Sequence, residues 1–290
     1  MKKFIGTDLH MENAFVDKII GKIPQDTGVY SEEALGNIRI CRIRISNEQE
    51  ARDYNCRKGT NITVFTPKLW EMESADIKNA SDKISKELRT LINGARSALV
   101  VGLGNDRLTA DSIGPLTAKK INVTRHIKLI EPTVLLANGL CSVSSVSCGV
   151  LGETGVRSLE IVKGIVEQIS PDIVIAVDSL SAREYERLGA TIQISDGGIS
   201  PGAGIGNRQY SISKDSLGVP VVSIGAPTVV SSCAIVYDAI KRHNALLDES
   251  EYESMINEQK HLFVSPKECD IIVEKASDVI SEAINKALGV

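Results

Sequence analysis

The segment Ile173-Val-Ile-Ala-Val177 decides the fold class, because it is a continuous apolar run with a carboxylate, Asp178, directly after it. Such a run is typical of a strand buried on both faces, as in a parallel sheet. Residues 154–169 precede it with apolar side chains on one helical stripe, and residues 98–103 form a second continuous apolar run. Strand, helix and strand in this order indicate βαβ units. We therefore expect an α/β fold, a three-layer αβα sandwich around a mainly parallel central sheet.

Weaker periodic segments surround this core. Residues 38–95 combine a partly alternating stretch with a helical one, and we expect them to form a smaller β-containing excursion from a single domain. Further strands are expected at 38–45, 61–66, 191–194 and 219–224, and further helices at 74–93, 227–242 and 266–288.

The composition is that of a globular protein and excludes several classes. The 290 residues include 33 Lys and Arg against 37 Asp and Glu, so the net charge of −4 argues against a strongly basic nucleic-acid-binding protein. No apolar run approaches the ~20 residues that cross a bilayer, so we expect no membrane span. The six cysteines form no C-x-x-C pair, and the N-terminus does not resemble a signal peptide. These features favour a cytoplasmic protein with reduced thiols, and no cofactor or metal is predicted.

A glycine-containing turn and an aspartate follow the first apolar run. Gly102-x-Gly104 could begin a dinucleotide-binding fingerprint, but Arg107 stands where its third glycine belongs, which argues against a nucleotide site. Asp111 follows near the expected start of a helix. It either complements the dipole of that helix or serves as a functional carboxylate.

Asp178 is the second candidate carboxylate. Ligands of open α/β sheets bind beyond the carboxyl ends of the strands, so Asp178 and Asp111 could meet in one crevice. Two neighbouring carboxyl groups can share a proton, which raises one pKa, and can activate a water molecule as general base and acid. The alternative for Asp178 is a cap on the following helix.

The glycine-rich segment 197–207, with Asp196 before it, is the third candidate. Such a segment lets the backbone approach a ligand or another chain closely, and a structural Ω-like loop is the alternative. The four histidines show no metal-ligand spacing. Serine and cysteine hydrolases are disfavoured, because neither a G-x-S-x-G motif nor a nucleophilic-cysteine signature is present.

Several segments resemble, in the same order, the signatures of the germination protease of spore-forming bacteria. The resemblance is strong over roughly 98–285 and faint over 38–95. It is carried by Gly102-Leu-Gly-Asn-x-x-x-Thr-x-Asp111-Ser-Ile-Gly-Pro, Gly149-Val-Leu-Gly-Glu-Thr-Gly155, Pro171-Asp-x-Val-Ile-Ala-x-Asp178-Ser-Leu, Ala190-Thr-Ile-Gln-Ile-Ser-Asp196, Pro201-Gly-Ala-Gly-Ile-Gly-Asn207, Gly225-Ala-Pro-Thr-Val-Val230 and Phe263-Val-Ser-Pro-Lys267.

This resemblance implies an endopeptidase that degrades small acid-soluble spore proteins during germination. It implies an atypical aspartic peptidase whose two aspartates correspond to Asp111 and Asp178. The fold it implies is a phosphorylase-like sandwich similar to that of hydrogenase maturation proteases. Those proteases hold nickel through an acidic residue at the same place and a His, for which we find no counterpart in this sequence. A homotetramer in the forespore or spore core is implied as well, with spore proteins as its partners and no direct contact to nucleic acid.

The family is made as a zymogen that trims its own N-terminus, and Thr7-Asp8-Leu9-His10-Met11-Glu12 resembles its processing site. The resemblance therefore implies a propeptide of residues 1–8, a cut between Asp8 and Leu9, and a peptidase domain of residues 9–290. The sequence departs from the family at three positions. His10 replaces a small residue, and Ala110 and Cys148 stand where proline is usual.

Substrate specificity is expected to mirror this site, with an acidic residue before the cut. Arg107 and Arg183 lie near the two aspartates in the sequence, so either could pair with that acid, or both could be solvated surface residues. Two other classes of function stay open. One is a metal-assisted hydrolase that uses Asp111 and Asp178 as ligands, and the other is a non-enzymatic binding module built on segment 197–207.

Overall fold

The structure is a computed structural model that describes residues 29–53, 58–137, 139–201, 211–242 and 262–290. The expected propeptide, the processing site at Asp8 and Leu9, and residues 202–207 of the glycine-rich segment lie outside the described residues.

A nine-stranded sheet runs through the described residues, in the order β1-β2-β3-β7-β8-β6-β4-β5, with β9 beside β8. Its parallel part consists of β5 (Ser142–Ser147), β4 (Ser97–Gly102), β6 (Ile173–Ala182) and β8 (Val221–Ser231). The continuous apolar runs in β4 and β6 are buried along almost their whole length. The parallel core predicted from these runs is therefore confirmed.

Beyond β8 the sheet is antiparallel. It continues through β7 (Thr191–Ser195), β3 (Gly59–Phe65), β2 (Ile38–Ile45) and β1 (Tyr30–Leu35), and β9 (Phe263–Val264) pairs with the other end of β8. The strands of residues 38–95 thus join the main sheet and extend it beyond β7. The connection between β1 and β2 is a tight turn at Gly36, which has a φ of +69°. A connection this short can join two strands only as antiparallel neighbours.

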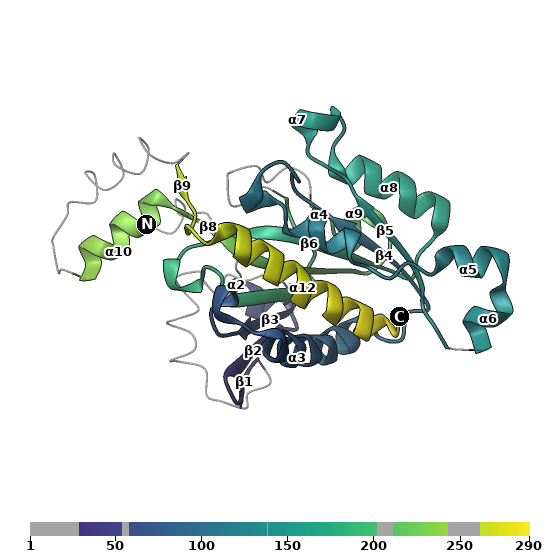
Figure 1. Ribbon diagram of the computed structural model, residues 1–290, viewed down its shortest axis with the longest axis horizontal. Helices are drawn as coiled ribbons and strands as arrows, with labels where there is room; N and C mark the ends of the chain where they lie inside the picture. The colour runs from purple at the N-terminus through teal and green to yellow at the C-terminus, as the bar shows by residue number, and fades with distance from the viewer. Residues whose placement is uncertain (1–28, 54–57, 138, 202–210, 243–261) are drawn as a thin grey trace.

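Helices cover both faces of the sheet, which confirms the three-layer αβα arrangement (Figure 1). One face carries α3 (Ser74–Ile92), α4 (Ile113–Lys119) and α12 (Cys269–Leu288), and the other carries α8 (Ser158–Ile169) and α9 (Lys214–Leu217). In α3, residues Ala80, Ile84 and Leu88 recur every four positions and are fully buried, so one stripe of the helix faces the sheet.

Two predicted helices begin later than expected. The helix expected at 227–242 starts only at α10 (Ser232–Arg242), because β8 continues through the β-branched residues 228–230. The helix expected at 154–169 starts at Ser158, because Gly155, with a φ of +70°, ends the short helix α7 (Leu151–Thr154) before it. The other short elements are α2 (Glu48–Asp53), α5 (Arg125–Ile130), α6 (Pro132–Ala137) and the 3-10 turns η2 (Leu69–Glu71), η3 (Thr109–Asp111) and η4 (Tyr185–Arg187). Within the described ranges, no helix is both long and apolar enough to span a bilayer.

Candidate active site

Asp178 lies at the point where the parallel sheet narrows. Gly102, the last residue of β4, pairs with Val177 of β6, so Asp178 is the first residue of β6 beyond the end of β4. The sequence predicted a strand that ends at residue 177, whereas β6 continues to Ala182 alongside β8, with Asp178 opposite Gly225. β6 therefore places Asp178 beyond the end of β4, although β6 itself does not end there. Asp178 is 6% exposed, and its Oδ1 accepts a 2.9 Å hydrogen bond from the Ser179 N–H.

Asp111 is placed by a loop that closes on itself after β4. The Asn105 N–H donates to the Asp111 Oδ2 at 2.9 Å and to its carbonyl oxygen at 3.0 Å, and the Asp111 N–H donates to the carbonyl of Leu108 at 2.8 Å. Gly104 makes this closure possible. Its φ of +104° favours glycine, and a Cβ there would lie 2.1 Å from the Asp111 carbonyl oxygen.

The backbone on either side of the two aspartates is locked together. The Ile113 N–H donates to the Ser179 Oγ at 3.2 Å, and the Thr228 hydroxyl of β8 donates to the carbonyl of Ala110 at 2.6 Å. The loop that begins at Leu103 is tied to β6 through a 2.8 Å hydrogen bond from the Leu103 N–H to the Val177 carbonyl. Ile113, two residues after Asp111, therefore contacts Ser179, the residue next to Asp178, and both aspartates lie at the same edge of the sheet.

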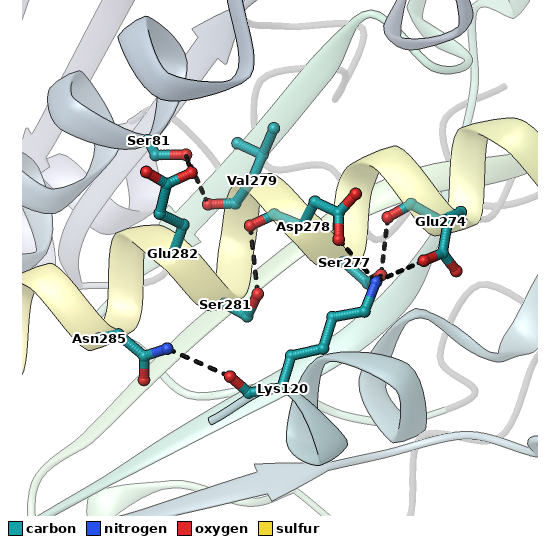
Figure 2. A network of polar contacts seen from close by, with 9 residues as sticks. All are labelled: Ser81, Lys120, Glu274, Ser277, Asp278, Val279, Ser281, Glu282 and Asn285. Carbon is teal, nitrogen blue, oxygen red and sulfur yellow. Dashed lines mark hydrogen bonds and ion pairs between the residues drawn. The ribbon is translucent and has the colours of Figure 1, made fainter. Parts of the chain in front are cut away.

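Helix α4, which begins just after Asp111, is anchored at its other end by Lys120. The Lys120 ammonium donates 2.7 Å hydrogen bonds to Glu274, Ser277 and Asp278 of α12, as Figure 2 shows. Asn285 of α12 also donates to the Lys120 carbonyl at 3.1 Å. Burial lowers the pKa of Lys120, but the bonds to Asp278 and Glu274 outweigh burial and raise it above its usual value. The cluster fixes α4 against α12, and with it the helical turn that follows Asp111.

The environment of Asp111 favours its protonated form. Burial raises the pKa of Asp111 to about 6, the hydrogen bond from Asn105 opposes this rise, and the charge of Glu153 adds to it. Glu153 belongs to α7, beyond the end of β5, and its Oε1 lies 3.5 Å from the Nε of Arg107. Glu153 could not be predicted from the sequence, because nothing in the sequence places residues 149–155 beside Asp111.

The other predicted site residues lie elsewhere. Asp196 accepts a 2.6 Å hydrogen bond from the Thr60 N–H and ties the end of β7 to the start of β3. Gln193 of β7 pairs with Gly225 of β8, which in turn lies opposite Asp178. Because β7 is antiparallel to β8, Asp196 lies three residues from that level, toward the opposite edge of the sheet.

The two arginines also differ in position. Arg183 lies five positions beyond Asp178, so at ~3.3 Å per residue the extended strand carries it about 16 Å away. There its guanidinium faces Asp238 of α10 at 4.0 Å. Arg107, by contrast, lies in the loop that holds Asp111, and its side chain is 84% exposed.

A nickel site of the maturation-protease kind does not fit the residues described. No group of three or more His, Cys, Asp or Glu side chains in the described ranges is arranged to hold a metal ion. His126, the one histidine within those ranges, is exposed on α5. Among the described residues, no imidazole of the kind that such a site uses therefore lies with the carboxylate pair.

Comparison with known proteins places this arrangement in a family. The sequence profile of the family described as "Germination protease" matches residues 20–244. The chain belongs to the germination protease family. The germination protease of Clostridium tetani is 37% identical over 311 residues, which cover 98% of this chain and 95% of the relative. The germination protease of Caldanaerobacter subterraneus is 38% identical, over 89% of this chain and 86% of the relative. That of Bacillus pumilus is 39% identical, over 73% of this chain and 58% of the relative.

Among solved structures, the chain is similar to the NiFe hydrogenase maturation protease HycI from Thermococcus kodakarensis. The TM-score is 0.40 and the identity 18%, over 70% of this chain and 99% of that protein. The family membership makes the chain a protease, a hydrolase associated with germination and sporulation.

Proposed function

We propose that this germination protease is an atypical aspartic endopeptidase in which Asp111 and Asp178 share a proton and activate a water molecule. The observation that carries the proposal is the locked backbone, in which Ile113 bonds Ser179 and so brings the neighbours of both aspartates into contact. The burial of Asp178 and the raised pKa of Asp111, about 6, support the proposal, because a carboxyl group that titrates near neutral pH can give or take a proton during the reaction.

The reaction is the hydrolysis of a peptide bond. One carboxylate takes a proton from the water as its oxygen attacks the carbonyl carbon, and the other gives a proton to the leaving nitrogen as the C–N bond breaks. The peptide is left as a free acid and a free amine.

The substrates proposed are small acid-soluble spore proteins, degraded during germination in the cytoplasm of the spore. The germination proteases among the relatives support this class of substrate by their name and their full-length similarity. The oligomer we expect is a homotetramer.

Cleavage is proposed to follow an acidic residue, read by Arg107. Its exposed guanidinium lies in the Asp111 loop, whereas Arg183 is held against α10. Arg107→Ala should erase the preference for a peptide with Glu before the cut over its Gln counterpart, measured as a ratio of kcat/KM values. Arg183→Ala is the matched control, and a full preference in Arg107→Ala would show that another group reads the acid.

The enzyme is also proposed to release itself from residues 1–8 by cutting between Asp8 and Leu9. A terminal segment of eight residues buries little surface, so the restraint it imposes should be local. N-terminal sequencing of the active form should begin at Leu9. An active enzyme that still begins at Met1 would contradict the proposal.

The test of the proposed function is to incubate the purified chain with a spore-protein peptide and identify the products by mass spectrometry. Cleavage should persist after exhaustive chelation. Loss of activity on chelation, restored by added metal, would favour a metal-assisted hydrolase, and binding with no cleavage in any form would favour a binding module.

A further inference from the structure

The segment that contains Glu153 lies at the open end of the parallel sheet, beside the Asp111 loop. β5 runs parallel to β4, and the Cys148 N–H just after β5 donates to the Gly102 carbonyl at the end of β4 at 3.2 Å. α7 follows immediately, where the Gly155 N–H bonds the Leu151 carbonyl at 2.9 Å. The segments that follow β5 and β4 therefore begin at the same edge of the sheet. The first contains Glu153 and the second contains Asp111.

The Glu153 side chain turns back toward this edge. A Cβ on Gly149 would lie 3.6 Å from the Glu153 Oε2, so the carboxylate folds over its own turn. Its other oxygen is 3.5 Å from the Nε of Arg107, which lies in the loop whose Asn105 N–H bonds Asp111. Glu153 is therefore held between its own turn and the loop that positions Asp111.

The charged groups around Asp111 come from its own loop, from α7 and from β6. Asp106 is half-exposed and pairs with Lys119 at 3.4 Å, and Arg107 is 84% exposed, so solvent screens both charges. The Glu153 side chain is only 25% exposed, so its charge, which raises the pKa of Asp111, is less screened. Asp178, on β6, is the other member of the pair.

We propose that Glu153 is a positioning residue of the catalytic pair, whose charge adds to the burial of Asp111 and helps its carboxyl group to hold a proton, so that Asp111 is the general acid and Asp178 the general base. This inference rests on the proposed function. Asp178 takes a proton from the attacking water, and Asp111 gives its proton to the leaving nitrogen. A proton then passes from Asp178 to Asp111 after the products leave, which restores the starting state.

The first test is the pH dependence of kcat/KM for Glu153→Gln with a peptide that the wild type cleaves. Neutralising Glu153 lets Asp111 ionise more readily, so the high-pH limb should move down by roughly half a pH unit, which is about a threefold lower rate on that limb. Glu153→Asp should restore most of the limb. Glu160→Gln is the matched control, because Glu160 also pairs with an arginine, Arg157, at 3.4 Å but belongs to α8.

The second test needs no activity, so its failure is separable from failure of the proposed function. The stability difference between wild type and Asp111→Asn should change with pH as Asp111 ionises. In a Glu153→Gln background this change should occur at lower pH. An unmoved limb and an unmoved stability transition in folded Glu153→Gln, or equal shifts in Glu160→Gln, would overturn the proposal.

Discussion

Asp111 is a buried group that can ionise, so its contribution to the stability of the fold depends on pH. Its folded pKa of about 6 lies above the ordinary value of 3.8, so the folded protein binds this proton more tightly than the unfolded chain does. The stability that results is fully present below about pH 4 and is lost as the pH rises through 6.

We therefore predict that Asp111→Asn is more stable than the wild type at pH 8, by up to about 3 kcal/mol, and has similar stability at pH 4. The asparagine keeps the shape and the acceptor for Asn105 but cannot ionise. Urea unfolding at the two pH values measures the difference, with Asp106→Asn as the exposed control. A difference that does not grow with pH would contradict the raised pKa.

At this scale the sequence predicted the pair Asp111 and Asp178 because each follows a recognisable buried strand. It could not place Asp196 or Arg183, because their positions depend on the direction of β7 and the length of β6, which pairing with β8 decides. The place of Glu153 beside the Asp111 loop could not be predicted for the same reason, because it depends on the alignment of β5 with β4.

Helix α4 packs unusually close to the strands beneath it. A Cβ on Gly114 would lie 2.1 Å from the Leu103 carbonyl oxygen and 2.5 Å from that of Val177. Both atoms are backbone, so neither can move without displacing the residues that lead to Asp111 and Asp178.

Gly114→Ala is therefore expected to destabilise the fold by about 2–3 kcal/mol or more, with a matching loss of activity. Gly164→Ala is the matched control, because Gly164 lies in α8 with nothing within 4 Å of the added Cβ. That change should stabilise the protein slightly, by about 0.5–1 kcal/mol. Chemical unfolding of both variants is the measurement, and equal stability of the two would refute the close approach.

The ion pairs of Lys120 with Glu274 and Asp278 should contribute to the stability of the fold. Lys120→Met keeps most of the aliphatic stem but leaves Glu274 and Asp278 without their shared cation. The expected loss is about 1–2 kcal/mol, since the cluster is partly exposed and lies between surface and buried ion pairs in strength. Lys119→Met, which removes an exposed pair with Asp106, should change stability by less than about 0.5 kcal/mol. Similar losses in both variants would show that the cluster does not anchor α4.

Elements with a strong apolar pattern were predictable and those without one were not. β4, β6 and α12 carry long apolar runs or stripes and lie where they were expected, although β6 continues five residues beyond its predicted end. β5 reads Ser-Val-Ser-Ser-Val-Ser, and the edge strand β1 buries only its first residue, so neither carries the pattern of a strand. Pairing with β4 and with β2 makes them strands.

At the scale of the molecule, the α/β class and the three layers followed from the sequence, whereas the mixed direction of the sheet did not. Apolar runs report burial on both faces and say nothing about the direction of a neighbouring strand. The position of Asp178 depends instead on strand length, because β8 continues beside Asp178 on one side while β4 has already ended on the other.

A comparison of cleavage rates decides whether Asp111 and Asp178 together hydrolyse a peptide bond. The rate of cleavage of a spore-protein peptide should be followed by mass spectrometry for the wild type, Asp111→Asn and Asp178→Asn, each in its trimmed form and each shown to be folded. We expect the wild type to cut after an acidic residue and both variants to lose more than ~100-fold of this activity. Near-normal cleavage by either folded variant would contradict it.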